Sequence, residues 1–281
     1  MPAELDAAAQ AVDLLSAAVD TAARHLASLS TADGKISVAK LDQHQVLAYD
    51  VAHAAAAVEA SRVMCAYGEQ GEMESMLARA YIADAFADIV SRLIGRDTMW
   101  GIDPATLAPA SAFVTAHRDP AFLEQLADQC AKHGSGPTHL SDDFELVAET
   151  FRRFAEDKIR PVAEHVHRTN GDVPEDIING LAELGGFGLS VPEEFGGFAS
   201  GGADDYLAMV VATEELSRAS LGIGGSLITR PEILTRALVR GGTDAQKRHW
   251  LPRSIVLIRW QLAQRTSHLA ISDEIFAQPQ L

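Results

Sequence analysis

The sequence predicts an all-α protein made of two helical bundle domains. Apolar residues recur at helical spacing through most of the chain, and no run of alternating strand residues precedes Arg253. A short stretch rich in glycine and serine separates the two helical parts. The 281 residues are enough for two ordinary domains. We expect a first domain over residues 1–133, a linker over 134–140, a second domain over 141–253 and an atypical tail over 254–281.

The first domain is expected to be a three- or four-helix antiparallel bundle whose many alanines let the helices approach closely. A first helix should cover about residues 5–29. A second should begin near residue 41 and be interrupted by Gly68 and Gly71, and the next should end at Gly95. From Ile102 to His139 the pattern weakens to one short helix over about 120–132. The second helix is expected to bury Val46, Tyr49, Val51, Ala52, Ala55, Ala56 and Val58.

The second domain shows helix start and stop signals in series. Ser141 is a candidate N-cap, and Pro161 should kink the helix that follows it. Pro174 and Gly185 mark the start and end of the next helix. A later helix is expected from Pro231 to Gly241, and the last has Thr243 as its N-cap.

Composition excludes several classes of function. The net charge of -16 argues against sequence-independent nucleic-acid binding, which needs a clustered basic surface. The two cysteines, Cys65 and Cys130, form no CxxC motif, which favours a reducing, cytoplasmic compartment. The N-terminus has no basic segment typical of a signal peptide, and no apolar run is long enough to span a membrane.

Short motifs add no catalytic residue and no metal site. The glycine clusters at residues 185–190 and 222–227 both lack the third glycine of GxGxxG, and neither follows a strand. His165 and His167 point to different faces of a helix, so they cannot share a metal. The chain becomes basic from residue 230 to 265. This run fits either an anionic ligand, such as a CoA phosphate, or a solvated helix face.

Residues 140–252 resemble the N-terminal helical domain of the acyl-CoA dehydrogenases. Four segments carry the resemblance: "FRRFAEDKIRPVAEHVHR", "VPEDIINGLAELGGFGLSVPEEFGG", "EELSRAS" and "GGTDAQKRHWLP". The most specific is the loop "LGGFGLSVPEEFGG", followed at the right distance by "GTDAQKRHWLP". Residues 41–101 are more faintly similar to the C-terminal helical domain of the same family, although here they come first in the chain.

The resemblance implies FAD-dependent α,β-dehydrogenation of an acyl-CoA thioester. A carboxylate base would remove the α proton, and the β hydrogen would leave as hydride to FAD. No catalytic base or flavin-binding residue of the family has a counterpart here. Five residues would contact the substrate by their position, and ordinary core or loop packing explains each of them equally well: Leu221, Gly224, Ser226, Leu227 and Thr229.

After Arg253 the resemblance ends, because no stretch resembles the family's flavin-contacting β domain. We therefore expect the middle β domain and the catalytic C-terminal bundle to be absent from this chain, through truncation, a frameshift or a genuine short form. The chain alone should then be inactive. The alternative functions are a non-enzymatic helical module, which forms a homo-oligomer or binds a helical partner, and a truncated gene product.

Overall fold

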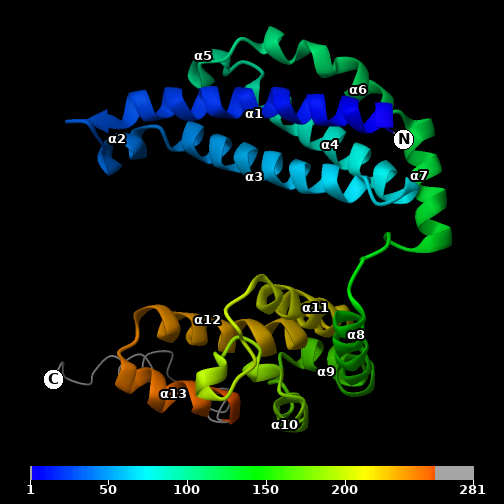
Figure 1. The fold of residues 1–281 in the computed structure, drawn as a ribbon, viewed down its shortest axis with the longest axis vertical. Helices are drawn as coiled ribbons and strands as arrows, with labels where there is room; N and C mark the ends of the chain where they lie inside the picture. The colour runs from blue at the N-terminus through cyan, green and yellow to red at the C-terminus, as the bar shows by residue number, and fades with distance from the viewer. Residues whose placement is uncertain (1, 257–281) are drawn as a thin grey trace. The chain divides into compact units, whose positions relative to one another are not determined.

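A computed structural model describes residues 2–256 of the chain and divides it into two compact units, with the division between Thr138 and His139 (Figure 1). Both units are helical in the described residues, and the only strands there are two of two residues each. The prediction of an all-α fold is therefore confirmed. None of the helices described is long and apolar enough to cross a membrane. The predicted tail beyond residue 256 lies outside the described residues.

Three long helices form the body of the first unit: α1 (Pro2–Ser30), α3 (Gln45–Gly68) and α4 (Glu72–Leu93). They lie alongside one another in Figure 1 and are in mutual contact. Gly68 ends α3 and Gly71 precedes α4, as the sequence predicts. The shorter helices are α2 (Val38–Gln43), α5 (Asp97–Trp100), η1 (Pro104–Ala110), α6 (Ser111–His117) and α7 (Pro120–His133).

The predicted buried face of α3 is confirmed at Val51 and Val58, which are buried, and Ala55 is partly buried. It is wrong at four positions that are exposed: Val46, Tyr49, Ala52 and Ala56. Val46 and Tyr49 are 55% and 65% exposed. Among the residues of α3 that are buried without having been predicted are Leu47, Asp50 and Ala54. Asp50 lies on the inner face of the helix, where its carboxylate accepts hydrogen bonds from Arg92 at 3.2 Å and Arg96 at 2.9 Å. A buried carboxylate is tolerated when it is paired in this way. Because α3 is alanine-rich all round, the apolar pattern alone does not identify its inner face.

Two further parts of the first unit differ from the sequence prediction. Thr31–Ala32 (β1) and Lys35–Ile36 (β2) form a small antiparallel hairpin. Its turn is Asp33-Gly34, with both residues at positive φ, a pair that favours such turns. The region predicted to hold one helix contains η1 and α6 as well as α7. Leu107, Ala110 and Phe113 of η1 and α6 are buried in the core, so that short apolar segment packs as helix despite its prolines.

The second unit has six α-helices in its described part: α8 (Asp142–Phe154), α9 (Arg160–Thr169), α10 (Glu175–Glu183), α11 (Ala203–Ala219), α12 (Ser226–Gly241) and α13 (Asp244–Val256). Short turns connect them: η2 (Ala155–Ile159), η3 (Gly186–Gly188), η4 (Glu193–Phe195) and η5 (Leu221–Gly225). The core contains Ile159, Ile177, Leu181, Leu216 and Leu227, all of which are fully buried. As predicted, Gly185 at positive φ ends the turn after α10.

Two prolines of this unit lie at irregular points of its helices. A π turn, η2, ends two residues before Pro161, and its wider winding accommodates a residue that has no N–H to donate. The helix predicted to begin at Pro231 actually begins at Ser226, so Pro231 lies inside α12 and is buried. Prolines favour the first helical turn, but packing outweighs that preference here.

A buried ion pair joins α8 to α11. The Glu215 carboxylate is almost fully buried and accepts hydrogen bonds from Arg152 at 2.8 and 3.0 Å, and Arg218 adds a weaker contact from its own helix. Glu214, its neighbour in sequence, is exposed. The two glutamates therefore point to different sides of α11 and form no carboxylate dyad.

Candidate functional site

The second unit contains a groove of about 690 Å³, a size that suits a small-molecule ligand. One wall is the end of α9 and the loop after it. The other wall is Ser220, the π turn η5 and the first turns of α12. The groove is lined by Ala163, Val166, His167, Asn170, Gly171, Asp172, Val173, Ser220, Leu221, Gly222, Ile223, Ser226 and Arg230.

The η5 turn has a defined shape because its backbone is held at both ends. The Ser220 hydroxyl accepts a hydrogen bond from the Ile223 amide at 3.3 Å, and the Gly224 amide donates to the Ser220 carbonyl at 2.8 Å. Gly224 also packs against α11 so closely that a Cβ atom there would lie 2.4 Å from the Leu216 carbonyl oxygen. Only glycine allows this approach, which fixes where Leu221 and Ser226 enter the groove.

The five residues predicted to contact substrate occupy different environments. Leu221 and Ser226 line the groove, and Leu221 is 76% exposed. Gly224 and Leu227 are buried beneath it in the core. Thr229 is exposed, and its hydroxyl donates to the Gly225 carbonyl at 2.7 Å. The structure therefore brings Leu221 and Ser226 together in the groove. Substrate contact by any of the five stays a prediction.

Several groove residues were not among the predicted site residues. Arg230 belongs to the basic run of residues 230–265, and that run is the sequence signal that could have identified it as a groove residue. The spacing of His167 from His165 excludes a shared metal and gives no signal for the groove that His167 lines. Asn170 adopts a left-handed conformation at the end of α9 and Asp172 follows it, and no motif in the sequence marks either of them. Asn170 and Asp172 come from the loop after α9, 51 and 49 positions before Leu221, so only the fold brings them to the same groove as η5.

The charges of the groove differ between its walls. Arg230 makes no hydrogen bond or ion pair with any described residue. By contrast, Arg236 further along α12 is bound by the Glu232 carboxylate and stacks over the Tyr206 ring. Asp172 is the groove's carboxylate, stands on the opposite wall and has an interaction of its own. The α12 wall therefore offers a cation to an incoming anion.

The glycine clusters do not form a flavin or nucleotide cradle within residues 2–256. Gly186 and Gly188 lie in a buried turn beside Leu181 and Phe198, and Gly224 packs on Leu216. The described residues show no flavin cradle at either glycine cluster, so no residue is assigned to FAD. Nor do they include a group of three or more histidine, cysteine or acidic side chains that could hold a metal ion.

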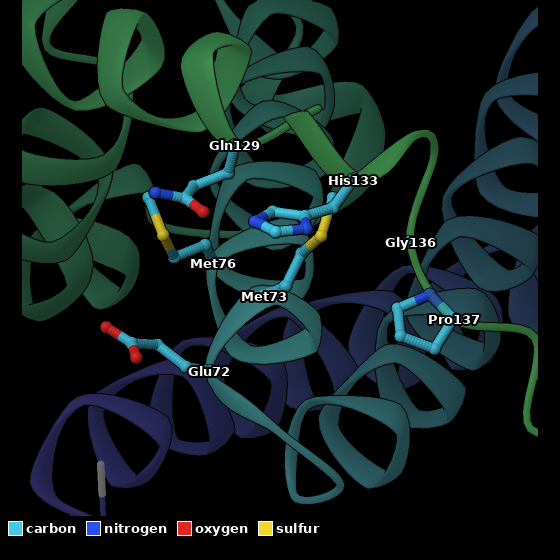
Figure 2. Close-up of a pocket in the computed structure, with 7 residues that line it drawn as sticks. All are labelled: Glu72, Met73, Met76, Gln129, His133, Gly136 and Pro137. Atoms are coloured by element: carbon cyan, nitrogen blue, oxygen red, sulfur yellow. The ribbon is translucent and has the colours of Figure 1, made fainter. Parts of the chain in front are cut away.

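A smaller cavity of about 390 Å³ lies in the first unit, between the start of α4, α7 and the segment after it. Figure 2 shows Met73 and Met76 extending from α4 toward His133 and Gln129 of α7. The Tyr67 hydroxyl donates to the Pro137 carbonyl at 2.9 Å and holds the segment after α7 in place. This cavity is unrelated to the residues predicted from the sequence, and its side chains form no recognisable catalytic group.

Comparisons with known proteins identify relatives of the second unit and of most of the chain. The sequence model of the acyl-CoA dehydrogenase N-terminal domain matches residues 141–256. The (2S)-methylsuccinyl-CoA dehydrogenase of Cereibacter sphaeroides is 34% identical over 271 residues, which cover 89% of this chain and 48% of that protein. Residues 141–256 belong to the N-terminal domain of the acyl-CoA dehydrogenase family. An alignment that covers this much of the chain includes most of the first unit as well as the second.

Other relatives align with a shorter part of the chain. Isovaleryl-CoA dehydrogenase of Arabidopsis thaliana is 39% identical over 120 residues, 41% of this chain and 28% of that protein. The 3-(aryl)acrylate reductase of Clostridium sporogenes is 38% identical over 113 residues, 40% of this chain and 28% of that protein. The chain thus spans about half the length of the methylsuccinyl-CoA dehydrogenase and about a quarter of these two proteins.

Proposed function

We propose that the second unit forms one wall of the acyl-CoA site of an FAD-dependent dehydrogenase, which oxidises the Cα–Cβ bond of an acyl-CoA thioester. The observation that carries this proposal is the groove between α9 and η5–α12. The groove lies inside the part of the chain that matches the family, and both Leu221 and Ser226 line it.

The lining of the groove suits a short acyl group. Val166, Leu221 and Ile223 provide apolar surface for a hydrocarbon chain, and Ser226 and Arg230 provide polar contacts beyond it. The relative that aligns over most of the chain is named for methylsuccinyl-CoA, and another is named for isovaleryl-CoA. Both names describe short, branched acyl groups, which we propose as the substrate class.

FAD enters the proposal through the family alone, where it supplies the hydride acceptor. Because neither glycine cluster makes a flavin cradle, we propose that the 281-residue polypeptide by itself retains no flavin and has no dehydrogenase activity. We place the protein in the cytoplasm, where the free thiols of Cys65 and Cys130 would stay reduced. Incubation with FAD, desalting and a visible spectrum test the flavin statement, and a retained flavin band would contradict it.

Calorimetric titration of the full chain with isovaleryl-CoA tests the acyl-CoA site. The variant Leu221→Asp should weaken binding about 10-fold or more, because it removes an apolar contact and places a carboxylate in the groove. Ile233→Asp is the matched control, since Ile233 is 69% exposed on α12 and does not line the groove. Absence of binding, or equal weakening by both variants, would contradict the proposal.

A second candidate function is association through exposed apolar surface. Large apolar side chains that are more than half exposed in the second unit include Leu146, Val210, Leu221 and Ile233. Surface of this kind favours docking of another protein or of a second copy. Sedimentation analysis of the purified chain distinguishes this candidate. A concentration-dependent oligomer that ignores acyl-CoA supports association as the function, whereas a monomer stabilised by acyl-CoA supports the substrate site.

A further inference from the structure

We propose that Arg230 is a specificity-determining residue that binds a carboxylate at the far end of the acyl group. The substrate class then narrows to CoA thioesters of short dicarboxylic acids. This inference rests on the proposed acyl-CoA site. It adds a preference for a negative charge at the end of the acyl group, which apolar contacts alone would not give.

The position of Arg230 carries the inference. Arg230 lies four residues after Ser226 on α12, so the two side chains share one face of the helix. Both line the groove, and Leu221 lies on the same wall. An acyl chain that lies along Leu221 would therefore meet a hydroxyl and then a guanidinium further along the same wall.

Arg230 is also available for an external anion. Among the described residues, Arg230 is the one lysine or arginine that lines the groove, and it has no hydrogen bond or ion pair with any of the others. Arg236 shows the opposite arrangement on the same helix, because Glu232 and the Tyr206 hydroxyl occupy its guanidinium. A guanidinium presents donors that match the two oxygens of a carboxylate, so Arg230 suits that group better than a neutral chain end.

The remaining charges of the groove allow this orientation. Asp172 belongs to the other wall and has an interaction of its own, so a substrate carboxylate is favoured only on the α12 side. His167 is on the Asp172 side, at the end of α9. Arg230 thus supplies the fixed positive charge of the groove.

The test compares two ligands that differ only at the end of the acyl chain. In 2-methylsuccinyl-CoA a carboxylate replaces the terminal methyl group of 2-methylbutyryl-CoA. The full chain is titrated with each ligand, and the ratio of the two dissociation constants is measured. We expect the dicarboxylic thioester to bind about 10- to 100-fold more tightly, as for charge-assisted hydrogen bonds, and the preference to weaken with added salt.

Variants of Arg230 assign that preference to one side chain. Arg230→Gln should reduce the ratio to about 1 by weakening only the dicarboxylic ligand, and Arg230→Lys should retain part of it. The matched control is Arg240→Gln, which removes another exposed arginine of α12 that pairs with no described residue and does not line the groove. Because Arg230 is exposed, the variants should melt at the wild-type temperature.

The outcomes separate this inference from the function on which it rests. If both ligands bind with equal affinity, or if Arg230→Gln keeps the preference, the inference is wrong and the acyl-CoA site stands. If neither ligand binds the wild-type chain, the acyl-CoA site is wrong and the role of Arg230 fails with it.

Discussion

Replacing Gly224 with alanine should destabilise the second unit by about 3 kcal/mol. The added Cβ would lie 2.4 Å from the carbonyl oxygen of Leu216 and 2.5 Å from its carbonyl carbon. Ordinary contacts are about 3.5 Å, so η5 and the end of α11 would have to separate by roughly 1 Å. That movement would also disturb the hydrogen bond from the Ser220 amide to the Leu216 carbonyl, which measures 3.3 Å.

The adjacent glycine provides the control. A Cβ on Gly225 would lie 3.4 Å from the Leu221 side chain and 3.8 Å from the Ser217 hydroxyl, which are ordinary contacts. Gly225→Ala should therefore leave stability within about 1 kcal/mol of the wild type, with a gain expected because alanine favours helix over glycine. The two variants differ in position by one residue and add the same methyl group.

Hydrogen exchange followed by mass spectrometry measures the effect within the second unit. Peptides from α11 and α12 should lose protection in Gly224→Ala and keep it in Gly225→Ala, while peptides of the first unit stay unchanged. Equal protection in both variants would refute the packing argument. If Gly224→Ala were as stable as the wild type but bound acyl-CoA less well, Gly224 would instead make room for the ligand, as its predicted site role implies.

Three further predictions concern stability. Hydrogen bonds from Arg152 hold the pKa of Glu215 below its ordinary 4.5, so the pair stabilises fully above that pH and less as pH falls through the lowered pKa. Glu215→Gln should lower the free energy of unfolding by about 2 kcal/mol at pH 7, a value reduced because Arg152 is half exposed. In urea unfolding measured over a series of pH values, the variant should lose less stability than the wild type as the pH falls, and an equal loss would contradict this. Burial lowers the pKa of His117, so the first unit should lose stability as pH falls below about 6.5, and His117→Gln should remove that dependence in thermal melts. Thr243 and Gln246 cap α13 reciprocally, with the Thr243 amide donating to the Gln246 side chain at 2.8 Å and the Gln246 amide donating to the Thr243 hydroxyl at 3.3 Å. Thr243→Ala should cost about 1 kcal/mol, seen as faster exchange of α13 amides, and unaltered exchange would argue against the cap.

The elements with strong local signals were predictable from the sequence. Gly68 and Gly71 mark the break between α3 and α4, and Gly185 marks the end of the turn after α10. The cap at Thr243 forms as predicted. Each of these signals depends on backbone geometry within a few residues, so it acts in the same way whatever packs around it.

The remaining features depend on contacts between distant parts of the chain. Asp50 is a polar residue on the inner face of α3. It is tolerated there because Arg92, in the last turn of α4, and Arg96, just after α4, pair with its carboxylate. Pro231 is tolerated inside α12 because buried neighbours hold the helix in place. The groove likewise combines a loop after α9 with the η5 turn, and no local pattern connects these segments.

The central claim is that the groove between α9 and η5–α12 binds the acyl part of an acyl-CoA. Hydrogen exchange of the full chain with and without 2-methylsuccinyl-CoA tests it most directly. The account predicts slower exchange in peptides covering residues 163–173 and 220–230, with the rest of the chain little changed. Unchanged exchange in those peptides, or protection confined to residues 1–138, would contradict it.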